Sequence, residues 1–126
     1  MPSSDTLERF VARVEAGAHV EAIAEFYAEN SRMRENMNDP RIGRDALIAH
    51  ERAVLARARS VESVCVRPIL VDGPIVVIRW IFRFGWADGT VTEMEELAWQ
   101  RWEGERIADE QFFYDPAQLK PRRPVA

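Results

Sequence analysis

Three glycine-containing turns divide the second half of the chain into segments of strand length. The turns are Asp72–Pro74, Ala87–Gly89 and Glu103–Glu105. The segments beside them are Val61–Val71, Ile75–Trp86, Val91–Trp102 and Arg106–Tyr114. Strands that follow one another through short turns pair with their neighbours as an antiparallel meander. We therefore expect one antiparallel sheet, in which Pro68 marks its own strand as an edge or the site of a bulge.

The first half of the chain carries helical patterns instead. Apolar residues three and four apart, from Leu7 to Val14, predict a helix that begins at an Asp5–Glu8 capping pair and ends at Gly17. A second helix is expected from about Val20 to near Asn30, and a third begins at Gly43. Helices first and a sheet afterwards is the α+β pattern.

Length and charge limit the possible classes of protein. The chain has 126 residues, which predicts a single domain (1–126) with an ordered core of about residues 5–116 and a tail at 117–126. Its net charge of −4 provides no basic surface for nucleic acid. We find no signal peptide and no apolar run near the ~18 residues of a membrane span. Cys65 is the only cysteine, which excludes an internal disulfide, so we expect a cytoplasmic protein without a membrane partner.

The segment Ile75–Trp86 has two different faces. Alternate residues on one face are all apolar: Val76, Ile78, Trp80, Phe82, Phe84 and Trp86. The other face mixes Ile75, Val77 and Ile81 with Arg79 and Arg83. The first face is expected to cover the core. The second is too apolar to be fully solvated, and we expect it to pack on another copy of the chain as a homodimer.

Taken in order, the helix, helix, short strand, helix and meander resemble the nuclear transport factor 2-like superfamily. Within it, they are similar to the SnoaL-like polyketide cyclase and ketosteroid isomerase groups. The segments that carry the resemblance are EAIAEFYAENSRMRE, IGRDALIAH and RWEGERIADEQFFYD, and it extends from about Leu7 to Pro116. The resemblance implies a cystatin-like α+β barrel: a cone-shaped, curved antiparallel sheet wrapped around three N-terminal helices. It also implies a pocket at the open end and dimers formed through the outer sheet face.

The resemblance also assigns three ketosteroid isomerase roles to positions of this chain. The catalytic base falls on Glu35, the oxyanion tyrosine on Val11 and the oxyanion acid on Ala98. Only the first of these positions keeps an ionisable side chain. Oxyanion stabilisation is usually the largest single catalytic term, so we do not expect this chain to isomerise ketosteroids.

Two carboxylates are the candidate catalytic groups. Glu51 lies at the centre of the apolar face of the third helix, where a carboxylate must be paired, protonated or beside a wet cavity. Alternatively, the helix is rolled so that Glu51 reaches solvent at the rim. Glu35 is either at the pocket mouth, as the resemblance implies, or an exposed acid between arginines. His19 is expected only to start a helix and His50 to be a partly buried helix residue; no metal site or cofactor is expected.

The last hairpin has two possible registers. In the first, the face carrying Glu96, Ala98 and Gln100, together with Glu110, Phe112 and Tyr114, lines the pocket. Glu93 and Glu95 would then pair with Arg79 and Arg83 on the outside. In the second, Leu97 and Trp99 face inward. We favour the first because convergent polar groups suit a small pocket. The expected ligand-binding residues are Tyr27, Trp80, Phe82, Glu96, Gln100, Glu110, Phe112 and Tyr114.

Two functions remain open at this point. One is an enzyme that binds a small hydrophobic, oxygenated molecule and acts on it by cofactor-free acid–base chemistry of the isomerase, cyclase or hydrolase type. In that hypothesis Glu35 and Glu51 are the catalytic residues. The alternative is a non-catalytic ligand-binding or dimerisation domain.

Overall fold

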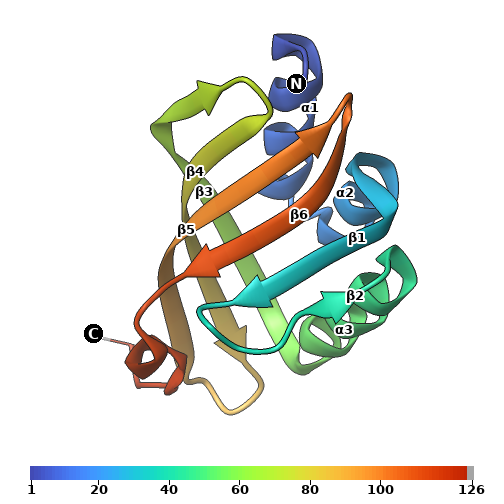
Figure 1. Cartoon of the computed structure of the whole chain (residues 1–126). Helices are drawn as coiled ribbons and strands as arrows, with labels where there is room; N and C mark the ends of the chain where they lie inside the picture. The colour runs from blue at the N-terminus through green and yellow to red at the C-terminus, as the bar shows by residue number, and fades with distance from the viewer. Residues whose placement is uncertain (125–126) are drawn as a thin grey trace.

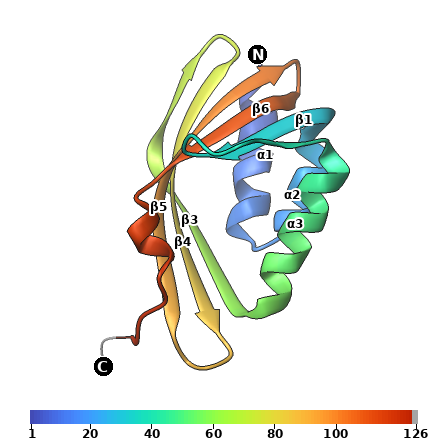
Figure 2. The same cartoon turned by 60° about the horizontal axis from the view of Figure 1, so that its bottom comes forward.

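The computed structural model describes residues 1–124 and contains three α-helices and a six-stranded sheet. The helices are α1 (Ser4–Glu15), α2 (His19–Phe26) and α3 (Arg44–Arg57). The strands are β1 (Tyr27–Glu35), β2 (Arg41–Ile42), β3 (Ala58–Asp72), β4 (Ile75–Trp86), β5 (Val91–Glu103) and β6 (Arg106–Phe113). A short 3-10 helix, η1, follows at Pro116–Leu119. The α+β class and the sheet curved around the helices are confirmed (Figures 1 and 2).

The sheet has the strand order β2-β1-β6-β5-β4-β3. The strands β3 to β6 form the predicted antiparallel meander, but β1 joins β6 in parallel, so the sheet is not wholly antiparallel. The parallel pair is possible because β2, α3 and the strands β3, β4 and β5 lie between β1 and β6 in the sequence. Strand β3 is an edge strand, and its register shifts between Val66 and Leu70. Pro68 lies in that shift, as predicted for a residue without an N–H.

Two helix boundaries differ from the sequence prediction. The N-cap of α1 is Ser3 and not Asp5, since Ser3 Oγ accepts a hydrogen bond from the Thr6 N–H at 3.1 Å. Helix α2 ends at Phe26 and not near Asn30, and Tyr27 begins β1 with extended backbone (φ −100°, ψ 142°). The apolar spacing of Tyr27 fits a helix, but pairing with β6 takes precedence.

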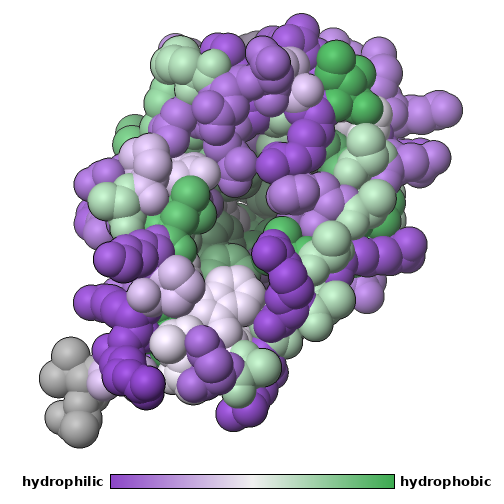
Figure 3. Space-filling view, turned by 90° about the horizontal axis from the view of Figure 1, so that it is seen from below, coloured by the Kyte–Doolittle hydropathy of each residue, from purple (hydrophilic) through white to green (hydrophobic). Residues whose placement is uncertain are grey.

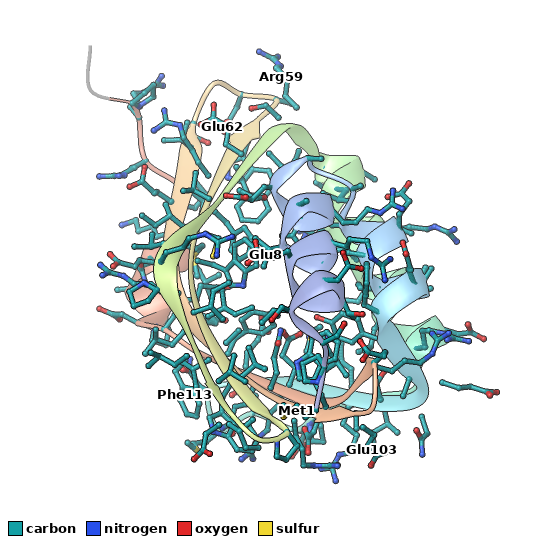
Figure 4. All side chains as sticks on the ribbon, turned by 90° about the horizontal axis from the view of Figure 1, so that it is seen from above. Met1, Glu8, Arg59, Glu62, Glu103 and Phe113 are labelled. Carbon is teal, nitrogen blue, oxygen red and sulfur yellow. The ribbon has the colours of Figure 1, made fainter. Side chains whose placement is uncertain are left out.

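The core lies between α1, α2 and the concave face of the sheet. Phe10 is packed edge-to-face against Phe26, Tyr27 and Trp102, with ring centroids 5.6, 6.2 and 5.9 Å apart. The N-terminus of α1 is tied to the β5–β6 turn, because Glu105 accepts a hydrogen bond from the Ser3 N–H at 3.1 Å. Viewed from this end, α1 lies across the sheet (Figure 4). This end of the cone is therefore filled by side chains.

The alternation along β5 confirms the first of the two predicted registers. Leu97 is 46% exposed on the outer face, whereas Ala98 is fully buried on the inner face. The side chain of Phe113, the last residue of β6, is 39% exposed and points away from the helices (Figure 4). The predicted ion pairs across β4 and β5 also form on the outer face; they are Arg79–Glu95 and Arg83–Glu93.

The segment after Asp115 is packed beside β5. The Gln118 side chain accepts a hydrogen bond from the Glu95 N–H at 2.8 Å, and Val91 and Arg122 exchange backbone hydrogen bonds at 2.7 and 2.8 Å. The expected tail is thus attached to the sheet as far as Arg122, and its last two residues lie outside the described range. No helix among residues 1–124 has the length and apolar character needed to cross a membrane.

Candidate functional site

A cavity of about 570 Å³ lies between the helices and the concave face of the sheet. It is within the usual size of small-molecule sites. Figure 3 looks into its mouth, where apolar side chains lie in the hollow and hydrophilic ones surround it. One wall is aromatic: Trp80 stacks on Phe82 and Phe84 on Trp86 along β4, with centroids 5.4 and 5.5 Å apart. Five strands, β1, β2, β4, β5 and β6, and all three helices contribute to the lining.

Most of the residues that the sequence indicated do line the cavity. They are Tyr27, Glu35, Glu51, Trp80, Phe82, Glu96, Glu110, Phe112 and Tyr114. Gln100 is the exception. Its side chain is fully buried, and it does not contribute to the lining formed by the described residues. The structure therefore places Gln100 behind the cavity wall, where its amide is hydrogen-bonded to Glu110 and Trp102.

Glu110 lies at the buried end of the cavity in a chain of hydrogen bonds. The Tyr27 hydroxyl donates to Glu110 Oε1, and Gln100 Nε2 donates to Glu110 Oε2 at 2.6 Å. Trp102 Nε1 in turn donates to Gln100 Oε1 at 3.0 Å. Burial raises the pKa of Glu110 to about 7, although the hydrogen bonds from Tyr27 and Gln100 act to lower it. Both carboxyl oxygens already accept hydrogen bonds from the protein, so Glu110 has a structural role at the buried end of the cavity.

Glu96 is a half-buried acid that lines the cavity without such hydrogen-bonding partners. No side chain among residues 1–124 donates a hydrogen bond to its carboxyl group. Burial raises the pKa of Glu96 to about 8, and the neighbouring carboxylates of Glu35, Glu110 and Glu51 raise it further. Glu96 is therefore largely protonated at neutral pH. A neutral carboxylic acid in an apolar cavity can donate a hydrogen bond to a ligand oxygen.

This acid alters the comparison with ketosteroid isomerases. Val11 and Ala98 are core residues with 1% and 0% exposure, so neither assigned position carries an oxyanion donor. Glu96, however, is two residues before Ala98 on the same face of β5 and lines the cavity. The position-by-position comparison with ketosteroid isomerases therefore did not identify Glu96 as the candidate hydrogen-bond donor on this strand.

The cavity mouth carries Glu35 and Tyr114. Arg41 Nη2 donates to Glu35 Oε2 at 3.2 Å, and both side chains remain about one third exposed (29% and 34%). Partial burial, followed by the charges of Glu35 and Glu96, raises the pKa of the Tyr114 hydroxyl to about 12. Tyr114 thus stays protonated as a donor beside the entrance.

Glu51 lines the helical wall of the cavity, as one of the two sequence hypotheses required. Its Oε1 lies 3.2 Å from His19 Nδ1, and His19 Nε2 lies 2.8 Å from Ser63 Oγ. His19 does begin α2, but its side chain is only 10% exposed, so the view of it as a helix-start residue and nothing more is wrong. Ser63 was also missed. It is separated from His19 by 44 positions, and no local pattern joins them.

The arrangement suits acid–base chemistry more than metal binding. Among the described residues, no three His, Cys, Asp or Glu side chains are grouped as metal ligands would be. The cavity instead combines a protonated acid, Glu96, with carboxylates that have donors of their own, Glu51 and Glu35. Acids and bases kept apart by their surroundings in one pocket are the usual components of proton-transfer sites.

The comparisons with known proteins agree on the fold. A family model described as a SnoaL-like domain matches residues 7–110. A candidate SnoaL-like polyketide cyclase from Jannaschia sp. CCS1 superposes with a TM-score of 0.75 at 14% identity, covering 91% of this chain and 89% of that one. A protein with a ketosteroid isomerase-like fold from Catenulispora acidiphila, solved with trimethylamine, gives 0.76 at 15% identity, covering 93% and 90%.

A third solved structure, TerC co-crystallised with polyporic acid, gives a TM-score of 0.76 at 10% identity, covering 91% of this chain and 92% of that one. At these identities the likeness concerns the fold alone. Among curated proteins, none matches the sequence significantly.

Proposed function

The chain belongs to the SnoaL-like domain family, and from that premise we propose that its cavity binds a small, largely apolar molecule bearing oxygen groups. We further propose that it acts on this molecule by cofactor-free proton transfer. The observation that carries the proposal is Glu96, a carboxyl held protonated in an aromatic cavity that also contains Glu51 and Glu35.

The chemistry that this arrangement supports begins at a carbon–hydrogen bond next to a ligand carbonyl. Glu51 or Glu35 accepts the proton, and Glu96 donates a hydrogen bond to the carbonyl oxygen as negative charge gathers there. Returning the proton to another carbon gives an isomer, and attack by the carbanion on a second carbonyl closes a ring. Neither step requires a redox group. Val11 in place of the oxyanion tyrosine remains a reason to expect no ketosteroid isomerisation.

Glu51 is the better candidate for the base. It has one donor in His19, and no described side chain donates to its Oε2. Glu35, in contrast, is paired with Arg41 at the mouth, where water competes for both groups.

Two experiments test the proposal. Polyporic acid, the ligand of a fold neighbour, should quench tryptophan fluorescence on binding beside Trp80 and Trp86, and Glu96→Leu should weaken its binding at least about tenfold. Trimethylamine serves as a comparison probe without oxygen. Proton abstraction is measured as deuterium uptake from D2O at the α-carbon of a small aryl ketone such as 2-tetralone, followed by NMR.

We expect exchange above the buffer rate, lost in Glu51→Gln and retained in Glu95→Gln, which alters an acid on the opposite face of β5. Ligand binding without any exchange would refute catalysis and leave the alternative, a binding domain. No binding of polyporic acid would refute the assignment of an oxygenated apolar ligand.

The outer sheet face is proposed to form a homodimer. Exposed apolar side chains lie across β3, β5 and β6 on this face: Val64, Leu97, Trp99 and Phe113, between 38% and 50% exposed. A band of this kind is unusual on a monomer. A second copy related by a twofold axis would cover it with the same residues.

A further inference from the structure

We propose that Ser63 and His19 form a positioning chain that holds the Glu51 carboxylate, so that one of its oxygens is kept for the ligand. The inference rests on the proposed role of Glu51 as the base. It assigns a purpose to a histidine and a serine that line up behind that base and that the proposed chemistry does not otherwise use.

Three separate elements bring the chain together. Ser63 is on β3, His19 begins α2, and Glu51 lies in α3. The Ser63 Oγ to His19 Nε2 distance is 2.8 Å, and the His19 Nδ1 to Glu51 Oε1 distance is 3.2 Å. The imidazole also packs against Phe82, with centroids 5.7 Å apart and planes at 60°. With both nitrogens engaged and the ring packed against Phe82, the imidazole is held in one orientation.

The Glu51 carboxylate and the Ser63 hydroxyl together select the tautomer of the ring. A neutral imidazole carries one N–H and one acceptor nitrogen. If Nδ1 were the acceptor, its lone pair would face the Glu51 carboxylate. If Nδ1 carries the proton instead, it donates to Glu51 Oε1, and Nε2 accepts a hydrogen bond from the Ser63 hydroxyl. The direction of the chain is therefore Ser63 to His19 to Glu51, which leaves Glu51 Oε2 to accept a proton from the ligand.

The same sequence of groups, hydroxyl, imidazole and carboxylate, occurs in serine hydrolases. In those enzymes the hydroxyl is the nucleophile. The burial of Ser63 argues against that role here. Ser63 is 8% exposed and does not contribute to the described lining of the cavity, whereas His19 and Glu51 do. A ligand in the cavity would meet the carboxylate end of the chain and not the hydroxyl end.

The tautomer can be measured without any ligand, by two-dimensional NMR of protein labelled with ¹⁵N-histidine. The chain has two histidines, so a His50→Gln spectrum assigns the signals. We expect His19 in the Nδ1–H form. The matched variants are Ser63→Thr and Ser63→Val, which add similar bulk but differ in the hydroxyl. Threonine should keep the Nδ1–H form, and valine should give a mixture with the Nε2–H form.

In the ketone exchange assay, Ser63→Val should lower kcat at least about tenfold with little change in KM, and Ser63→Thr should restore it. Wild-type His19 in the Nε2–H form, or an unchanged tautomer in Ser63→Val, would overturn the inference. Labelling of Ser63 by a fluorophosphonate would also overturn it, because the hydroxyl would then be a nucleophile. If the tautomers behave as expected but no exchange is seen, the positioning chain stands and the proposed chemistry fails. If the valine variant does not fold, the wild-type tautomer still decides.

Discussion

Replacing Glu96 by Gln is expected to remove a large pH dependence from the stability of the protein. The pKa of Glu96 is about 8 in the folded state, against an ordinary value of 4.5. Between these values the folded protein keeps a proton that the unfolded chain has lost. The free energy of unfolding therefore falls as the pH rises through this window. Below the unfolded pKa both states hold the proton and the folded state carries no penalty.

The size of the effect follows from the same difference. A gap of about 3.5 pH units at about 1.4 kcal/mol per unit gives about 5 kcal/mol between the two ends of the window. This figure is an upper bound because water enters the cavity mouth. Gln has nearly the same shape as Glu and remains neutral, so Glu96→Gln should be about as stable as wild type at low pH and several kcal/mol more stable at high pH.

The assay is urea denaturation followed by tryptophan fluorescence, repeated from pH about 5 to about 9. Glu95→Gln is the matched control, since Glu95 is on the same strand but exposed on the outer face beside Arg79. The gap between wild type and Glu96→Gln should widen with pH, whereas the control should run parallel to wild type. Glu110, with a pKa of about 7, leaves a smaller slope in both proteins. Parallel curves for wild type and Glu96→Gln would refute the assignment of a protonated, unsupported acid.

Three further changes test other parts of the site and the surface. Tyr27→Phe removes a donor that lowers the pKa of Glu110, so it should raise that pKa above about 7. It should also lower the free energy of unfolding by about 1–3 kcal/mol, mostly at high pH. A carboxyl ¹³C titration of Glu110 identical to wild type would contradict this. Glu51→Gln should abolish ketone exchange but shift the melting temperature by only a few degrees, about 1 kcal/mol or less, because the amide can still accept from His19; a loss of fold would make Glu51 structural. Trp99→Lys should convert a particle of twice the 14.5 kDa chain mass into one of that mass by light scattering; a wild type that is already monomeric at micromolar concentration removes the homodimer proposal.

Much of the sheet could be predicted because strand faces repeat every two residues and turns mark where each strand ends. The inner face of β4 and the outer ion pairs of β4 and β5 follow directly from that period. The junction at Tyr27 could not be predicted in the same way. Its spacing fits the helix before it, and only the distant strand β6, with Glu110 for its hydroxyl, makes the extended form favourable.

The candidate site separates two things that the sequence pattern cannot distinguish. Glu96 and Gln100 share the inner face of β5, and both were expected to meet a ligand. Gln100 lies toward the β5–β6 turn, where α1 and its aromatic neighbours cover the sheet, so its amide is hydrogen-bonded to Glu110 and Trp102. Glu96 lies further from that turn, beside the cavity, and no described side chain donates a hydrogen bond to it. The period of a strand determines which face a residue joins. Its distance from the closed end of the cone determines whether that face is packed or wet, and this is decided by helices far away in the sequence.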